Sequence, residues 1–295
     1  MGKATKAATP KAKAGKAATP KAKASKAATP AAKASKASTA SKARKAGGKA
    51  TAAEEPYPDW SAPSPEVASE ATAALAVAHG DYMPQKAAEA RKSILDSLVR
   101  TILSQNTTDK TSQVAFDRLK AGLPRWSEVL DAPEGVAEEL VRCGGLAEVK
   151  MERVRLILRD ARVAGRGADG EPSLEWLHDE PDDAEVKAVL KSFKGVGPKT
   201  ISCVMMFTMG RAEFPVDTHV LHIAKMCKWI PESATREKAY EHLNRRIPND
   251  CKYPLHVLLV EHGKCCTRCA KNGKLQKKEC ALEGPCPLLS LGARD

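Results

Sequence analysis

Two patterns are missing from this sequence of 295 residues: a long apolar run and the alternation that is typical of β-strands. No apolar run reaches the length that crosses a bilayer, so we expect a soluble protein without a membrane partner. β-Branched alternation is nearly absent, and no Asn-Gly turn joins two apolar runs. Apolar residues recur instead at helical spacing, which predicts an all-α fold with helices over 67–79, 86–103, 112–119, 136–141 and 154–163.

The first 50 residues also lack acidic and aromatic side chains. They hold 13 Lys and 1 Arg, and since the whole chain has a net charge of +12, residues 51–295 carry −2. The segment has too few large apolar residues to offset the entropy cost of ordering, and we therefore expect residues 1–50 to be disordered. The composition resembles a linker-histone tail, which binds DNA or chromatin by counterion release, or acts in nuclear import. A spacer without a partner and a mitochondrial transit segment are the alternatives.

Beyond the tail, the composition predicts further divisions of the chain. An acidic, proline-punctuated linker covers 51–65, a globular domain covers 66–288, and a C-terminal tail covers 289–295. The globular part suits one large domain or two small helical subdomains that share a cleft. Within it lie two segments with chemistry of their own, a hairpin at 190–209 and a cysteine loop at 265–286.

The hairpin segment reads LKSFKGVGPKTISCVMMFTM and predicts a helix, a glycine turn and a second helix. Gly195, Val196 and Gly197 form the turn, and Pro198 follows where the first turn of a helix tolerates proline. The free N–H groups of such a turn, together with the positive end of the second helix, form a site for a phosphate. A glycine turn that serves packing alone is the alternative.

Two side chains near this turn can carry chemistry, Lys199 and Asp217. A lysine amine in its neutral form is a nucleophile, which a Schiff-base enzyme requires. Pro215 marks a turn that can present the Asp217 carboxylate toward Lys199. A surface ion pair is the alternative for the two residues.

The run LKSFKGVGPKT, with VDTH farther along, resembles the helix-hairpin-helix and Gly/Pro-Asp signature of the endonuclease III family of DNA glycosylases. The resemblance extends from about residue 91 to 288. It implies the HhH-GPD fold, two helical subdomains with a cleft between them. It also implies that Lys199 is the nucleophile and Asp217 the essential carboxylate. DNA-binding residues are then expected in the turn and just beyond it: Gly195, Val196, Gly197, Thr200 and His219.

A second family-like segment is LSQNTTD, whose counterpart in the family inserts a glutamine beside the flipped nucleotide. The alignment puts Asn106 at that position and Gln105 one residue earlier, and either amide can bond to exposed base edges. A plain helix end, with Thr108 or Asp109 as the next cap, is the alternative. In CGGLAEVK, Lys150 is expected to be a solvated surface lysine or to meet a phosphate.

The sequence has nine cysteines, five of them near the C-terminus. Many members of the resembled family bind a [4Fe–4S] cluster there through C-x6-C-x2-C-x5-C, whereas this chain has C-x2-C-x10-C-x5-C. Cys266, Cys269, Cys280 and Cys286 can hold an iron–sulfur cluster or a structural zinc, and a loop without metal is the third alternative. Without a signal peptide we expect a reducing compartment and no disulfides, in the nucleus or, alternatively, the mitochondrion.

The resemblance implies a complete reaction. The enzyme flips a damaged base out of double-stranded DNA, and Lys199 attacks C1′ to form an imine, after which β-elimination nicks the strand. We therefore predict a monomeric, bifunctional DNA glycosylase and AP lyase in base excision repair, acting on oxidised pyrimidines. The alternatives are a monofunctional glycosylase for mismatched or alkylated bases, and a chromatin protein that only binds DNA.

Overall fold

The computed structural model describes residues 55–81, 91–164, 167–277, 285–289 and 291. In these ranges every regular element is a helix and none is a strand, which confirms the prediction of an all-α fold. Residues 52–295 form one unit. No helix in the described ranges is both long and apolar enough to cross a membrane.

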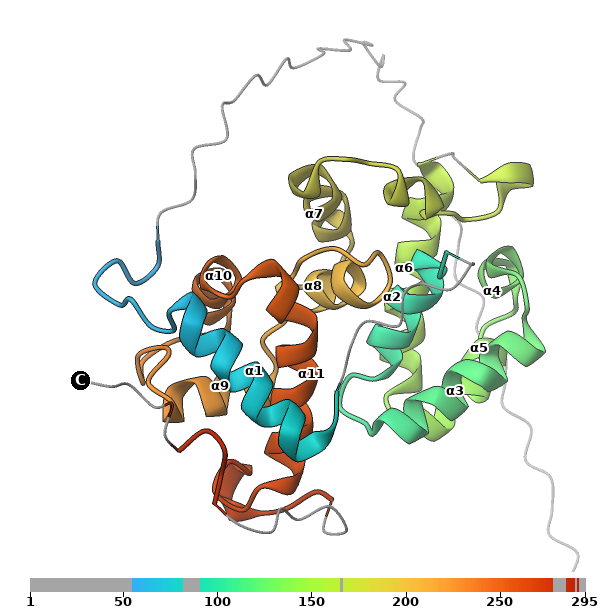
Figure 1. Ribbon diagram of the computed structural model, residues 1–295. Coiled ribbons are helices and arrows are strands. Elements are labelled where there is room, and N and C mark those ends of the chain that lie inside the picture. The colour runs from blue at the N-terminus through green and yellow to red at the C-terminus, as the bar shows by residue number, and fades with distance from the viewer. Residues whose placement is uncertain (1–54, 82–90, 165–166, 278–284, 290, 292–295) are drawn as a thin grey trace, which may run out of the picture. The chain divides into compact units, whose positions relative to one another are not determined.

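The helices fall into two groups, each with its own apolar core (Figure 1). The first group comprises α2 (Ile94–Leu103), α3 (Asp109–Gly122), α4 (Trp126–Asp131), α5 (Val136–Val141), α6 (Ala147–Val163), α7 (Asp183–Ser192) and α8 (Pro198–Phe207). The second group comprises α1 (Pro65–His79), α9 (Thr218–Met226), α10 (Arg236–Arg246) and α11 (Asn249–Cys265). Short 3₁₀ turns lie at η1 (Arg142–Gly144), η2 (Ala168–Gly170), η3 (Glu175–His178) and η4 (Lys271–Gly273).

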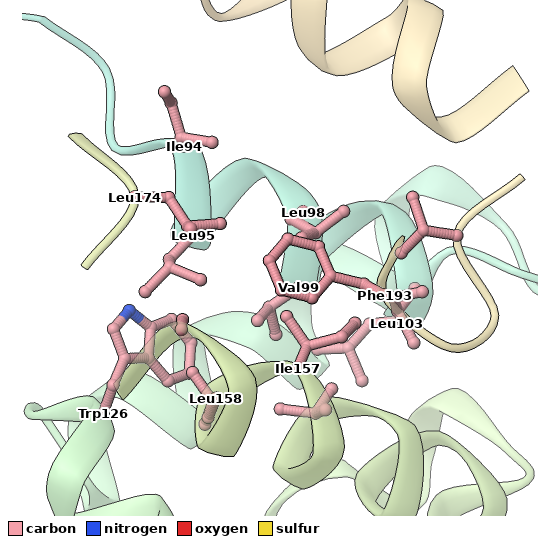
Figure 2. Close-up of a cluster of buried hydrophobic side chains, with 14 of the residues drawn as sticks. Ile94, Leu95, Leu98, Val99, Leu103, Trp126, Ile157, Leu158, Leu174 and Phe193 are labelled. Carbon is pink, nitrogen blue, oxygen red and sulfur yellow. The ribbon is translucent and has the colours of Figure 1, made fainter. Parts of the chain in front are cut away.

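Helix α2 is the centre of the first core. It places apolar side chains at helical spacing against α6, and Leu98, Val99 and Ile157 lie within one cluster with Phe193, the C-cap residue of α7 (Figure 2). Phe193 thus fixes the hairpin segment to the same core. The predicted helix 86–103 is wrong at residues 91–93, because Ser93 accepts a hydrogen bond from the Asp96 amide at 3.2 Å and caps a helix that begins at Ile94. Residues 86–90 of that prediction lie outside the described residues.

The second core joins distant parts of the sequence. Helix α1 packs along α11 (Figure 1), and both add buried side chains to a core around Phe214 and Trp229. The described end of the expected linker also contacts this group, since Trp60 Nε1 donates to the Lys228 carbonyl at 3.0 Å. Nε2 of His242, on α10, donates a hydrogen bond to the Ala62 carbonyl at 2.7 Å, and Nδ1 of the same ring lies 2.6 Å from Glu55 Oε1.

Candidate active site

The turn between α7 and α8 has the backbone that its two glycines suggest. Gly195 has φ of 86°, the left-handed region that favours glycine, and a Cβ there would lie 3.2 Å from Arg153 Cδ. Gly197 has φ of −100°, and nothing lies within 4 Å of a Cβ placed on it. Gly195 is therefore required by the fold, whereas Gly197 leaves open space in front of the helix that follows.

Helix α8 begins immediately after this open position. Pro198 occupies its first turn, and no side chain caps its N-terminal amides. The amides of Lys199 and Thr200 belong to the first turn, where a helix has no internal acceptor for them. These two amides and the positive end of the helix are the features that a helix N-terminus uses to bind an anion, so the predicted phosphate site stays a prediction.

A cavity of about 480 Å³ adjoins the turn and α8. Lys199 is exposed, lines this cavity, and also lines the neighbouring hollow beside α2. Val216 and Tyr240, which belong to the second core, also line it, so both helical groups contribute to the cavity. The cavity brings together six of the residues that were expected to act on DNA: Gln105, Asn106, Gly195, Gly197, Lys199 and Thr200.

Asp217 stands next to Val216 and begins α9. Its Oδ1 accepts a hydrogen bond from the Val220 amide at 2.8 Å, so the carboxylate serves as the N-cap of that helix. The residue is half-buried. Capping fixes the orientation of the carboxylate, because a helix N-terminus stabilises negative charge and rigidly positions the group that caps it.

Lys199 and Asp217 act on the same two buried groups, the Cys203 thiol and the His256 ring. Burial raises the pKa of Cys203 and lowers the pKa of His256 to about 4, and the charges of Lys199 and Asp217 act on both groups with opposite signs. The two charged residues therefore lie within electrostatic range of the same pair of neutral groups. Sequence reasoning missed His256.

His256 is a buried residue of α11 that lies beside the turn before Asp217. Its Nδ1 donates to the Pro215 carbonyl at 2.8 Å, since a carbonyl can only accept, and Phe207 and Phe214 pack edge-on against its ring. The His256 hydrogen bond fixes the turn from which Asp217 projects. The signal that could have found it is a histidine within the apolar run of α11, L-H-V-L-L.

The two residues after α2 that were expected to insert beside the flipped nucleotide, Gln105 and Asn106, are in different environments. Gln105 is half-buried and its Oε1 accepts a hydrogen bond from Arg153 Nη1 at 2.9 Å. Asn106 is exposed and has φ of 55°, a left-handed conformation that asparagine tolerates. Thr108 caps α3 by accepting from the Thr111 amide at 3.2 Å, which confirms its expected capping role.

Both expectations for Lys150 were wrong. The side chain is buried, and Nζ donates hydrogen bonds of 2.8 Å to the carbonyls of Leu103 and Gly144. Desolvation lowers the pKa of this amine. The carbonyls at the end of α2 have no partner inside the helix, and Lys150 satisfies one of them from across the core. It thereby holds the end of α2, from which Gln105 and Asn106 extend.

His219 does not line the cavity. It lies in the first turn of α9 and packs against α11, where a Cβ on Gly263 would lie 2.6 Å from its Nδ1. Val196 is buried and its amide donates to the Phe193 carbonyl at 3.1 Å, so Val196 contributes to the turn through packing.

A separate group of possible metal ligands lies at the end of α11. Ligand atoms of His262, Cys266, Cys269 and Cys286 all lie within 4.8 Å of one another. Cys280, the other expected ligand, lies outside the described residues. Sequence reasoning missed His262, because it considered only cysteines. The expectation of free thiols throughout was also wrong for Cys265, which is disulfide-bonded, because spacing alone does not show which sulfur atoms approach bonding distance.

Comparison with known proteins identifies the relatives of this chain. An Arabidopsis thaliana protein named as a candidate DNA glycosylase is 46% identical over 198 residues, which are 67% of this chain and 66% of that protein. The DNA glycosylase/AP lyase ROS1 of the same plant is 30% identical over 179 residues, 55% of this chain and 12% of ROS1. The alignments thus span less than two thirds of either relative.

A solved structure of a non-covalent endonuclease III–DNA complex has the same fold. Its TM-score is 0.54 at 20% identity, over 75% of this chain and 91% of that chain. The profile of the HhH-GPD superfamily base excision DNA repair proteins matches residues 99–249, a range that contains the glycine turn, Lys199, Asp217 and the loop of Gln105 and Asn106. The chain belongs to the HhH-GPD superfamily of base excision DNA repair proteins.

Proposed function

We propose that this protein is a DNA glycosylase with AP lyase activity, and that Lys199 is its nucleophile. The observation that carries the proposal is the position of Lys199, an exposed amine in the first turn of α8, in a cavity that also holds the loop of Gln105 and Asn106. The relative ROS1 is named as a glycosylase and AP lyase, which supports the lyase step. A glycosylase that used water as the nucleophile would not require an amine at this position.

The DNA backbone is held in this proposal by the start of α8. The amides of Lys199 and Thr200 donate to one phosphate, and the open space in front of Gly197 lets the phosphate approach. Asn106, which is exposed, fills the gap that the flipped nucleotide leaves in the stack. Gln105 is held by Arg153, which fixes the residue that precedes Asn106.

The chemistry follows once the base is flipped into the cavity. Asp217 stabilises the positive charge that develops on the sugar and accepts the proton that the Lys199 ammonium must lose. The neutral amine forms a bond from Nζ to C1′, the bond from C1′ to the base breaks, and the base leaves with the bonding electron pair and takes up a proton. The sugar ring then opens to an imine, loss of a C2′ proton breaks the C3′–O bond, and the strand is nicked.

The substrate class that we propose is double-stranded DNA with an oxidised pyrimidine. The resemblance to endonuclease III supports this choice. Arg236 and Glu237 line the same cavity as Lys199, and provide polar groups that can hydrogen-bond to the edge of a flipped base.

Borohydride trapping tests the proposal. Duplexes with an oxidised pyrimidine, an abasic site or no damage are incubated with the native protein, with Lys199→Ala and with Lys191→Ala, an exposed lysine of α7 that serves as the control. We expect a covalent adduct that requires damage, disappears in Lys199→Ala and persists in Lys191→Ala. Base release without an adduct would instead identify a monofunctional glycosylase, and binding without base release would identify a DNA-binding protein.

We also propose that the protein is a monomer of the nucleus and that residues 1–50 bind DNA through their charge. The fourteen positive charges of this segment support binding by counterion release. Deletion of residues 1–50 should reduce the slope of log Kd against log salt concentration for an undamaged duplex. An unchanged slope would contradict this role of the segment.

A further inference from the structure

The end of α11 and the segment after it bring four ligand atoms to one point. His262 lies in the last turn of α11, Cys266 and Cys269 follow the helix, and Cys286 comes from farther along the chain. His262, Cys266 and Cys269 are buried, and Cys286 is partly exposed. This group is separate from the cavity that contains Lys199.

The distances in this group match the size of one metal ion. Cys269 Sγ lies 3.6 Å from Cys286 Sγ, and His262 Nε2 lies 3.3 Å from Cys286 Sγ. Around a tetrahedral zinc with Zn–S bonds of about 2.3 Å, neighbouring ligand atoms lie roughly 3.7 Å apart. With all four ligand atoms within 4.8 Å of one another, the group is compact enough for one ion to be bound by all four.

A four-iron cluster does not fit these residues. In such a cluster each cysteine binds a different iron, so the four sulfur atoms must stand farther apart than ligands of a single ion. The four ligand atoms here lie within 4.8 Å of one another, and one of them is an imidazole nitrogen. Among the described residues, the arrangement therefore departs from the four-cysteine site that the endonuclease III resemblance implies.

We propose that His262, Cys266, Cys269 and Cys286 bind one zinc ion as a closed, structural site. Three cysteines and one histidine are an established ligand set for structural zinc, and four protein ligands leave no open position for catalysis. Thiolate and imidazole ligands in a tetrahedron also select zinc over the hard cations magnesium and calcium. The ion links the end of α11 to Cys286 and so fixes the C-terminal segment on the second core.

His79 is a positioning residue for this site. Its Nε2 lies 2.9 Å from Nδ1 of His262, and the two rings meet edge-on with centroids 5.2 Å apart. When His262 binds zinc through Nε2, its proton must be on Nδ1, and this N–H donates to His79. Such outer partners fix the tautomer and orientation of a histidine ligand. His79 belongs to the last turn of α1, so the zinc site also depends on the contact between α1 and α11.

Metal analysis of the purified full chain tests the proposal. We expect about one zinc per chain and no stoichiometric iron or acid-labile sulfide. Cys269→Ser should lose the zinc, and Cys143→Ser, an exposed thiol outside the group, should retain it. After replacement of zinc by cobalt, the native chain should show the absorption of a tetrahedral thiolate site, and this absorption should weaken in Cys269→Ser.

A milder variant keeps the test decisive if Cys269→Ser does not fold. His79→Phe retains all four ligands, and we expect its zinc affinity, measured by competition with a chromophoric chelator, to fall about 10–100-fold. About four irons per chain with matching sulfide, or a native chain without metal, would overturn the proposal. Unchanged zinc binding in both Cys269→Ser and His79→Phe would overturn it as well. None of these readouts depends on glycosylase activity, so failure here leaves the proposed function standing.

Discussion

Arg153 on α6 donates a hydrogen bond from Nη1 to Oε1 of Gln105, at 2.9 Å. Its aliphatic portion also lies against Gly195, where a Cβ would be 3.2 Å from Arg153 Cδ. One side chain thus contacts both the loop after α2 and the glycine turn before α8. The relative position of the two segments therefore depends on Arg153, although the sequence separates the first from the second by ninety residues.

Arg153→Ala should weaken binding to a duplex with an abasic site. Loss of one charge-assisted hydrogen bond, about 1.4 kcal/mol, corresponds to a roughly tenfold rise in Kd. Arg159→Ala, an exposed arginine of the same helix, serves as the control and should bind normally. The double variant with Gln105→Ala should be no weaker than Arg153→Ala alone. Additive losses would show that Arg153 acts on the DNA directly rather than through Gln105.

Gly195→Ala should mainly reduce stability, whereas Gly197→Ala should mainly reduce DNA binding. Gly195→Ala is expected to lower the free energy of unfolding by about 1–2 kcal/mol, because alanine is strained at a φ of 86°. Gly197→Ala should change stability by less than about 0.5 kcal/mol, since its φ is −100° and the space around it is open. Its methyl group should nevertheless weaken DNA binding. Urea denaturation and duplex titration separate the two effects, and a Gly197→Ala chain that binds normally would contradict the phosphate site.

Lys150→Met should destabilise the first group of helices. Methionine retains most of the apolar stem but leaves the carbonyls of Leu103 and Gly144 without their donor. An unsatisfied buried acceptor costs about 1–3 kcal/mol, so we expect the urea midpoint to fall clearly. Lys110→Met, at an exposed position of α3, is the matched control. Equal midpoints for the two variants would show that the Lys150 hydrogen bonds add no net stability.

His256 should make stability depend on pH below neutrality. Its pKa is about 4 in the folded chain, against an ordinary value near 6.5, so the unfolded chain binds more protons between these values. The free energy of unfolding contributed by this group is present above about pH 6.5 and is lost as the pH falls toward 4, by up to about 3 kcal/mol. His256→Asn retains a donor for the Pro215 carbonyl without the titration. Its stability should therefore fall less steeply from pH 6.5 to 4.5, and an identical slope would contradict this assignment.

The sequence was sufficient for features that depend on neighbouring residues. The glycine turn, the start of α8 at Pro198 and the cap at Thr108 all follow from local backbone preferences. The burial of Lys150 and the bond between Arg153 and Gln105 could not be predicted, because they join segments more than forty residues apart and leave no periodic pattern. The role of His262 as a possible metal ligand was not predicted for a different reason: a histidine is common in the last turn of a helix without any metal.

The packing of α1 along α11 has a consequence for the order in which the chain folds during synthesis. Helices α2–α8 are contiguous in sequence and share one core, so this group can form as soon as the ribosome has released it. Helix α1 emerges earlier, but its apolar residues Ala71 and Leu75 cannot be buried until α11 is synthesised, nearly two hundred residues later. The second core is therefore completed last. While the ribosome translates helices α2–α8, the nascent chain exposes the apolar face of α1, which is a target for chaperones.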